Sequence, residues 1–227
     1  MSVLTVALTG GIATGKSVVA KILTDHGCFV QSADQLAHDL MTPGRPAWRQ
    51  IVAHFGTDIL NQDRTVNRTR LGAIIYSSAK ERHFLNRLIH PLVLAKKKTA
   101  IRTLEKKATH KIFVSEAALT VESGFAPFFD KVIVVHCPER LQVERLMKRD
   151  GITRRDAWKR LRSQMPTAEK IKQADYLIET SGSTEETAAQ TERVYKNLLA
   201  DFRKKQAQEK RRPARSRPRA RRRAAEP

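Results

Sequence analysis

The sequence has little of what marks a secreted or membrane-spanning chain. Only two of its 227 residues are cysteines, Cys28 and Cys137. Each lies beside an apolar run, so we expect reduced thiols buried in a core rather than a disulfide or a metal site. No stretch approaches the roughly 18 consecutive apolar residues of a membrane helix, and residues 1–4 lack the basic region of a secretory signal. These absences predict a cytoplasmic protein without membrane insertion.

Acidic residues are scarce relative to basic ones. The chain has 43 lysines and arginines against 23 aspartates and glutamates, which gives a net charge of +20. Half of this excess, +10, falls in residues 203–227, which contain almost no large apolar side chains. Such a segment cannot bury enough surface to order itself, so we expect a disordered basic tail. Its charge suits non-specific contact with a polyanion such as nucleic acid, and a purely solubilising tail explains it equally well.

What the chain does contain is an alternation of short apolar runs and helical patterns, which predicts an α/β fold. The first run is followed by a glycine-rich turn, then by apolar residues at helical spacing that end before Gly27, and then by the second run. Strand, turn, helix and strand within residues 1–32 form a βαβ unit. Buried strands of a parallel sheet are expected at residues 4–8, 28–31, 112–114, 132–135 and 176–178.

Two stretches are expected to be helical additions to one domain of residues 1–202. Residues 34–107 show helical patterns and no convincing strand; they are too long for an ordinary crossover and predict a helical substrate subdomain. Residues 138–167 hold a basic helical pair, predicted at 139–149 and 154–165, in which Thr153 can cap the second helix. This pair predicts a lid. The core is then made up of residues 1–33, 108–137 and 168–202.

A phosphate-binding loop lies between the first strand and the first helix. Residues 10–17, Gly-Gly-Ile-Ala-Thr-Gly-Lys-Ser, match the pattern G-x-x-x-x-G-K-[ST] in the strand-to-helix context that it requires. The glycines let successive N–H groups point at phosphates, and the positive end of the helix adds to that field. Lys16 would reach the β- and γ-phosphates of ATP, and Ser17 would ligate Mg²⁺. The alternative explanation of the pattern is a glycine turn beside an exposed lysine. If the segment is a phosphate-binding loop, the residues expected to contact ATP are Gly11, Ile12, Ala13, Thr14, Gly15, Lys16, Ser17 and Val18.

Asp34 and a group of arginines are the candidates for the transfer step. Asp34 lies just past the second strand, where ligands of open α/β sheets collect, so it suits a base or a group that orients a hydroxyl. Capping of a helix that begins near Gln35 is an equally good explanation of its position, and the two roles are compatible. Cations that close over the γ-phosphate stabilise the anionic transition state, although any single arginine can instead be a solvated surface charge. The lid arginines are Arg145, Arg149, Arg154 and Arg155.

Residues 3–183 contain an ordered set of short sequence blocks: Ala7 to Ser17, Ala33-Asp34, Ala37-His38, Pro43-Gly44, His90-Pro91, Glu122-Ser123-Gly124, Gln142 to Leu146, Arg149-Asp150-Gly151, Gln164-Met165-Pro166 and Ala174-Asp175. In this order they resemble the dephospho-CoA kinase family. The phosphate-binding loop alone is shared by many kinases, but the ordered set is specific. The resemblance implies a P-loop kinase fold with a five-stranded parallel sheet flanked by helices, a helical substrate domain and a lid.

The same resemblance implies a reaction and the roles of particular residues. ATP with Mg²⁺ would phosphorylate the 3′-hydroxyl of dephospho-CoA to give CoA and ADP, the last step of coenzyme A biosynthesis. Asp34 would activate or orient the ribose hydroxyl, and Arg145 with Arg149 would serve the lid side of the phosphates, so that these three residues and Lys16 are catalytic. The substrate-binding residues would be Asp34, His90 and Glu122, although His90 can instead be a satisfied imidazole in a helix-breaking His-Pro pair.

Three positions depart from the family's common pattern. Ser32 stands where an aspartate often precedes the Ala-Asp pair, which leaves Asp34 as the single carboxylate at that strand end. Glu116 stands where a proline is frequent, and it can meet Mg²⁺ through water, hold the substrate domain, or be a buried, paired glutamate. Thr180 replaces a usual asparagine, which leaves open how the adenine is held.

Two other functions are compatible with the sequence. Another small-molecule, nucleoside or nucleotide kinase of the same fold would share the loop, the insertion and the lid. A nucleic-acid-binding protein that acts through residues 203–227 would use the ATP site for regulation. The ordered motifs favour the dephospho-CoA kinase interpretation, and they leave the oligomeric state open.

Overall fold

The backbone forms an α/β fold around one parallel sheet. The structure is a computed structural model that describes residues 2–211. Its strands lie in the order β2-β3-β1-β4-β5, and every neighbouring pair is parallel. The expected five-stranded parallel sheet is confirmed, and each strand boundary falls within about two residues of its predicted place. The strands are β1 (Leu4–Gly10), β2 (Phe29–Ser32), β3 (Ile112–Glu116), β4 (Lys131–His136) and β5 (Tyr176–Glu179).

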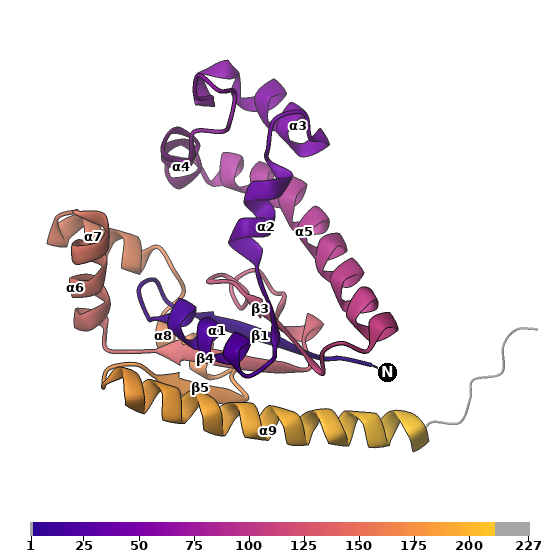
Figure 1. Ribbon diagram of the computed structural model, residues 1–227. Coiled ribbons are helices and arrows are strands. Elements are labelled where there is room, and N and C mark those ends of the chain that lie inside the picture. Colours follow the sequence, from indigo (N-terminus) through magenta and orange to yellow (C-terminus); the bar gives the residue numbers. More distant parts are fainter. Residues whose placement is uncertain (1, 212–227) are drawn as a thin grey trace, which may run out of the picture.

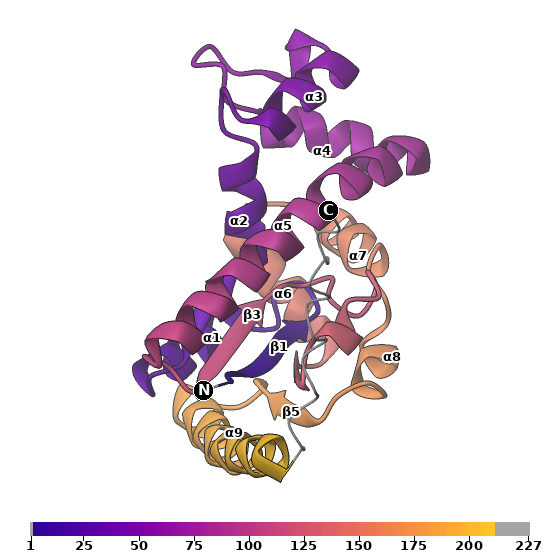
Figure 2. The same ribbon diagram turned by 90° about the vertical axis from the view of Figure 1, so that its right-hand side faces the viewer.

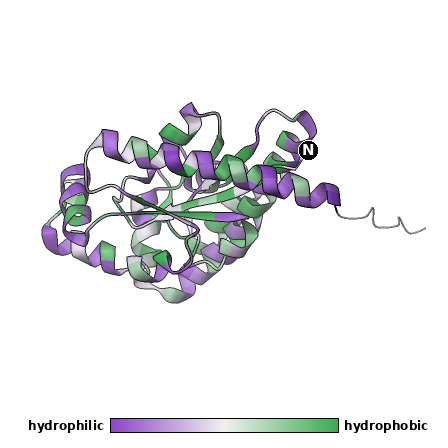
Figure 3. Ribbon diagram, turned by 90° about the horizontal axis from the view of Figure 1, so that it is seen from below, coloured by the Kyte–Doolittle hydropathy of each residue, from purple (hydrophilic) through white to green (hydrophobic). Residues whose placement is uncertain are grey.

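Helices cover both faces of this sheet (Figure 1). On one face, α1 (Lys16–Asp25) and α9 (Thr184–Arg211) share a core with alternate strand residues such as Val6, because successive side chains of a strand point to opposite faces. Ala7 belongs to the core on the other face. Figure 3 shows apolar strands between helices whose outer sides are largely polar. The second face is covered by the end of α5 (Ala79–Lys107), by the 3₁₀ turn η2 (Ala126–Phe128) and by α8 (Thr167–Ile171).

A helical region rises from the sheet between β2 and β3 (Figures 1 and 2). It packs on a core of its own that includes Trp48, Ile51 and Leu85. The long helix α5 continues through Pro91, so the His-Pro pair does not break the helix. Both α2 and α5 lead from this region back toward the sheet, and each carries side chains to the strand ends. The region contains α2 (Ala33–Leu40), α3 (Pro46–Phe55), the 3₁₀ turn η1 (Thr57–Ile59), α4 (Arg68–Ser77) and α5.

Two helices after β4, α6 (Glu139–Asp150) and α7 (Arg154–Arg162), pack against the loop that follows β1. Their buried apolar side chains, Leu146 among them, contact Ile12 and Ala13 of that loop. The expected cap is confirmed, because the Thr153 hydroxyl accepts a hydrogen bond from the N–H of Asp156 at 3.2 Å. The second helix was predicted to reach residue 165, but it ends at Arg162, and the short α8 begins after Pro166. Pro166 disfavours helical backbone at the residue before it, so a helix through residue 165 is disfavoured.

The C-terminal helix corrects the expected start of the tail. We predicted disorder from residue 203, whereas α9 continues to Arg211. Phe202 is buried in the sheet core, and Lys205 donates to the Val3 carbonyl at 2.9 Å and to Asp130 at 2.7 Å. Gln206 donates to the Ser2 carbonyl at 2.8 Å. The composition of residues 203–211 gave a wrong prediction because this segment is held by polar contacts with Ser2, Val3 and Asp130 rather than by apolar burial. The remainder of the predicted tail, residues 212–227, lies outside the described part of the chain.

Both cysteines are buried free thiols, as expected. Burial raises the pKa of the Cys28 thiol to about 12 and also raises that of Cys137 above its ordinary value. Both thiols are therefore protonated at neutral pH and unsuited to nucleophilic chemistry. Within residues 2–211, no helix combines the length and the apolar character needed to cross a membrane.

Candidate active site

The loop between β1 and α1 has the geometry of a phosphate cradle. Gly15 has a left-handed φ of 84° immediately before the first residue of α1. A Cβ atom at Gly10 would collide with the carbonyl oxygen of Val135 on β4, so only glycine fits there. The Lys16 amine donates to the carbonyl oxygens of Gly10 at 3.2 Å and Gly11 at 2.8 Å. The Lys16 amine is thus held against the loop at the N-terminus of α1, where the helix dipole and a nearby cation both favour a bound phosphate.

Side chains from distant parts of the chain hold this loop in shape. The Thr180 hydroxyl, directly after β5, donates to the Thr14 carbonyl at 2.7 Å. The Ile12 N–H donates to the side-chain oxygen of Gln164 at 2.8 Å. Thr180 is 4% exposed, so the residue that the sequence left undecided is a buried support of the phosphate loop.

The charge on Lys16 is set by its surroundings. Burial, assisted by the nearby Lys170 cation, lowers the pKa of Lys16 to about 8, against the opposing effects of Glu116 and Asp34. Phosphates bound in the loop would favour the ammonium form, because an opposite charge nearby stabilises it. Ser17 lies beside Lys16 in the first turn of α1 and is exposed. Its hydroxyl is therefore accessible to a ligand of the loop.

Three titratable groups meet at the carboxyl ends of neighbouring strands. Glu116 ends β3, which lies between β1 and β2. Burial raises the pKa of Glu116, while the charge of Lys16 lowers it and that of Asp34 raises it. These mutual effects require the three groups to lie close together. The sheet order thus brings Asp34 beside the phosphate loop, although 18 residues separate it from Lys16 in the sequence.

Asp34 does not cap its helix. The cap of α2 is Ser32, whose hydroxyl accepts a hydrogen bond from the N–H of Gln35 at 3.3 Å. Asp34 lies in the first turn and is exposed, where its charge also complements the helix dipole. The capping explanation of Asp34 is therefore wrong, because the helix begins two residues earlier than predicted. Ser32, noted from the sequence only as a departure from a family pattern, has this capping role.

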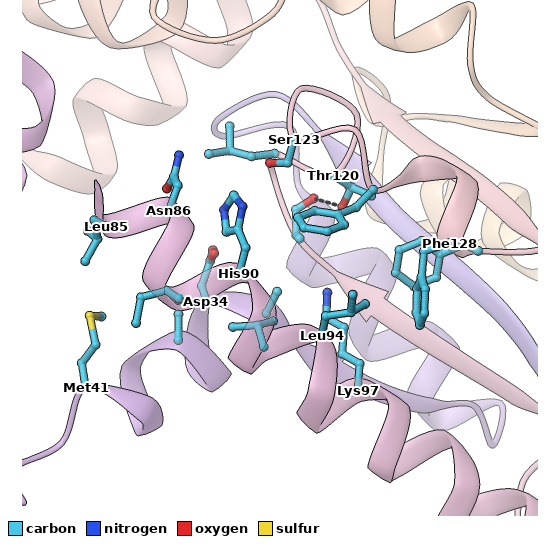
Figure 4. Close-up of a pocket in the computed structure, with 18 residues that line it drawn as sticks. Asp34, Met41, Leu85, Asn86, His90, Leu94, Lys97, Thr120, Ser123 and Phe128 are labelled. Atoms are coloured by element: carbon cyan, nitrogen blue, oxygen red, sulfur yellow. Dashed lines mark hydrogen bonds between the residues drawn. The ribbon is translucent and has the colours of Figure 1, made fainter. Parts of the chain in front are cut away.

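A pocket lies beside Asp34, between α2, α5 and the segment after β3 (Figure 4). His90 faces it from α5, with its ring 5.2 Å from that of Phe125 in an edge-on arrangement. Burial, assisted by the charge of Lys97, lowers the pKa of His90, so the imidazole is neutral at pH 7. The sequence prediction for Asp34 and His90 places them in one site, and both line this pocket. A mostly apolar concavity with a few polar groups suits a small organic substrate; the polar side chains that line it are Asp34, Asn86, His90, Lys97, Thr120 and Ser123.

Glu122, expected to bind substrate, is not part of the lining of this pocket. Its carboxylate lies 2.5 Å from the amine of Lys170, whose side chain is fully buried. The same amine donates to the carbonyl of Ala118 at 3.1 Å. This ion pair fastens α8, which follows the lid, to the segment that lines the pocket. Glu122 thus supports the pocket wall, and its contact with substrate stays a prediction.

The two lid arginines lie in different surroundings. Arg145 donates to the Thr180 carbonyl at 2.6 Å and to its hydroxyl at 3.2 Å. With Gly15 and Val18 it lines a second pocket, separate from the one beside Asp34. This position favours a contact on the outer side of the nucleotide, and the predicted role of Arg145 at the transferred phosphate stays a prediction.

Arg149 is the lid arginine whose charge reaches the phosphate loop. It is more exposed than Arg145 and bonds to Asp150 at 2.7 Å, and its charge contributes to lowering the pKa of Lys16. Arg154 and Arg155, at the start of α7, are exposed. The structure thus brings Lys16, Asp34 and Arg149 toward a common centre.

Sequence analysis missed two buried lysines in this area, Lys97 and Lys170. A signal for Lys97 was present, because it lies seven residues after His90 in a predicted helix, and that spacing puts two residues on one helix face. Lys170 had no such signal. Its partners come from a segment some fifty residues earlier, which only the fold brings close.

A sequence model of the family described as dephospho-CoA kinase matches residues 4–186. The dephospho-CoA kinases of Geobacillus kaustophilus and Carboxydothermus hydrogenoformans are 42% and 40% identical, over 82% of this chain and 92% and 89% of theirs. The solved structure of dephospho-CoA kinase from Campylobacter jejuni matches with a TM-score of 0.63 and 29% identity, over 86% of this chain and 96% of that one. The chain belongs to the dephospho-CoA kinase family.

Proposed function

We propose that this protein transfers the γ-phosphoryl group of ATP to the 3′-hydroxyl of dephospho-CoA, giving CoA and ADP. The observation that carries the proposal is the position of the phosphate loop after β1 and of Asp34 after β2 at the same edge of the sheet, with only β3 between the two strands and a substrate-sized concavity beside Asp34. We infer dephospho-CoA as the acceptor from the relatives, which are described as dephospho-CoA kinases. A kinase needs both parts adjacent, because the attacking oxygen and the γ-phosphate must come in line.

Asp34 and Lys16 have distinct tasks in this step. The 3′-oxygen forms a bond to the γ-phosphorus while the bond from that phosphorus to the β–γ bridging oxygen breaks, and the hydroxyl proton passes to Asp34. Asp34 is free for this task, because Ser32 caps the helix. Lys16 presents its charge to the β- and γ-phosphate oxygens, and with a pKa of about 8 it is mostly ammonium at pH 7. We assign Arg149 to the phosphates from the lid side.

Oxygen donors beside the loop fit Mg²⁺. The exposed hydroxyl of Ser17 and the carboxylate of Glu116 are ligands of the type this ion prefers. When bound, Mg²⁺ neutralises charge on the β- and γ-phosphates. We propose Ser17 as its direct ligand and Glu116 as a ligand through water.

The test is ADP release by the purified chain with Mg²⁺-ATP and either dephospho-CoA, adenosine or no acceptor, with mass detection of the product. We expect a product heavier by one phosphoryl group with dephospho-CoA. Equal ADP release with every acceptor and with none would contradict the proposal. It would point instead to a nucleotide-dependent binding protein.

Three further expectations stay predictions. They are a cytoplasmic location, the oligomeric state, and non-specific contact of the basic C-terminal residues with a polyanion. The last concerns mainly residues 212–227, outside the described part of the chain.

A further inference from the structure

One buried cation in the pocket beside Asp34 has no partner among residues 2–211. Lys97 is 7% exposed and lines the pocket, and Figure 4 shows its amine directed into the pocket interior. Within the described chain that amine takes part in no hydrogen bond or ion pair, and its one aromatic contact is with the ring of Phe129, 5.6 Å away. The stem of this side chain is buried while its amine stays accessible from the pocket, so an anion that enters the pocket can reach the amine and pair with its charge in surroundings that screen it little.

The surroundings of Lys97 leave room for such an anion. Burial lowers the pKa of Lys97 to about 8, and the charge of Asp34 opposes that change. His90, two helical turns earlier, is neutral and can donate a hydrogen bond from its ring. The neighbours Lys96 and Lys98 are exposed, so water solvates their charges.

We propose that Lys97 forms an anion subsite within this pocket and binds the diphosphate of the acceptor. The inference rests on the proposed function. In dephospho-CoA the diphosphate is bonded to the 5′-oxygen of the same ribose whose 3′-hydroxyl is phosphorylated. Asp34 and Lys97 then hold two ends of one sugar nucleotide unit, and the contribution of Lys97 is to its binding. The subsite selects a diphosphate-bearing acceptor over a neutral riboside.

The experiment compares the wild-type chain with K97M, K97R and the matched control K96M, an exposed lysine of the same helix. We expect K97M to raise the KM and the calorimetric Kd for dephospho-CoA at least about tenfold, since a charged hydrogen bond is lost, while the KM for ATP and the kcat change little. K97R should stay near wild type, and K96M should not change. With adenosine as acceptor, the kcat/KM of K97M should equal that of wild type, because adenosine has no diphosphate.

Thermal unfolding separates binding from a structural role. Removing an unpartnered buried charge should leave the Tm of K97M unchanged or raise it, whereas a supporting role would lower it. If K97M does not fold, K97Q replaces it in the same assays. An active wild type whose K97M binds dephospho-CoA as tightly, or loses equally on adenosine, would overturn the subsite alone. A wild type that does not phosphorylate dephospho-CoA would overturn both proposals.

Discussion

The nucleotide side and the acceptor side of this site are built in different ways. The nucleotide side is one continuous segment, residues 10–18, which acts through backbone groups and one lysine. The acceptor side gathers side chains from α2, from α5 and from the segment after β3. The backbone path of the loop depends largely on local conformations such as that of Gly15, with Thr180 and Gln164 as distant supports, whereas the acceptor pocket exists only when three distant segments pack. The two sides should therefore respond differently to substitution.

The largest effect is expected on the nucleotide side, from Lys16→Ala. It removes the charge that faces the β- and γ-phosphates, so kcat/KM should fall roughly 10³-fold or more. Steady-state kinetics with both substrates varied measures this. Lys21→Ala is the matched control, because Lys21 is an exposed lysine of the same helix that pairs only with Asp25. A comparable loss in the control would assign the effect to the helix rather than to the phosphate contact.

On the acceptor side, Asp34→Asn should lower kcat by about 10²-fold or more while the Kd for ATP stays the same. The change keeps the shape of the side chain and removes its capacity to accept the proton. Asp39→Asn, an exposed position on the same helix, should behave as wild type. Intact turnover in Asp34→Asn would remove this carboxylate from the proposed mechanism.

The ion pair of Lys170 with Glu122, which holds α8 against the wall of the acceptor pocket, can be removed by substituting Lys170. Lys170→Met leaves Glu122 buried without its partner, which should cost about 3–5 kcal/mol of unfolding free energy. The double variant with Glu122→Gln should recover part of that loss. Denaturant unfolding measures the stability. In steady-state kinetics of the folded fraction, the KM for the acceptor should rise by a larger factor over wild type than the KM for ATP. If the two KM values rise equally, the pair does not act through the acceptor pocket.

The charge state of Lys16 gives a pH test of the nucleotide side. With its pKa lowered to about 8 in the free protein, kcat/KM for ATP should be level below pH 8 and fall about tenfold per pH unit above it, since the neutral amine lacks the needed charge. The measurement uses saturating acceptor, so that Lys97 is occupied. A profile level to pH 10 would contradict the lowered pKa.

The smallest effect on activity is expected from the C-terminal end of α9, whose contacts with Ser2, Val3 and Asp130 lie outside both pockets. Deleting residues 212–227 should leave the Tm unchanged. Deleting residues 204–227 should destabilise the fold by about 1–3 kcal/mol, because the contacts of Lys205 with Val3 and Asp130 and of Gln206 with Ser2 are lost. Both deletions should keep full turnover at low temperature. Equal melting temperatures would show that these contacts contribute nothing measurable.

Much of the fold could be predicted because its signals are local. The five strands are short apolar runs, and the helices from α1 to α7 follow apolar spacing within single segments. Prediction failed where stability comes from distant polar partners. The end of α9 has the composition of a disordered tail, and its contacts with Ser2 and Val3 are about 200 residues away in the chain. The start of α2 was misplaced because Ser32 and Asp34 are both good capping residues.

The sequence by itself determined the phosphate loop, the parallel sheet and the family, because each depends on residue types at fixed short spacing. Only the tertiary structure decided which charged side chains share a site. It placed Glu116 beside Lys16 and Asp34, paired Glu122 with Lys170, and buried Lys97 where no other residue of the described part of the chain pairs with it. The physical reason is that electrostatic and hydrogen-bonding partners are selected by distance in space, and for these residues that distance is set by the sheet order and by the packing of α2, α5 and α8.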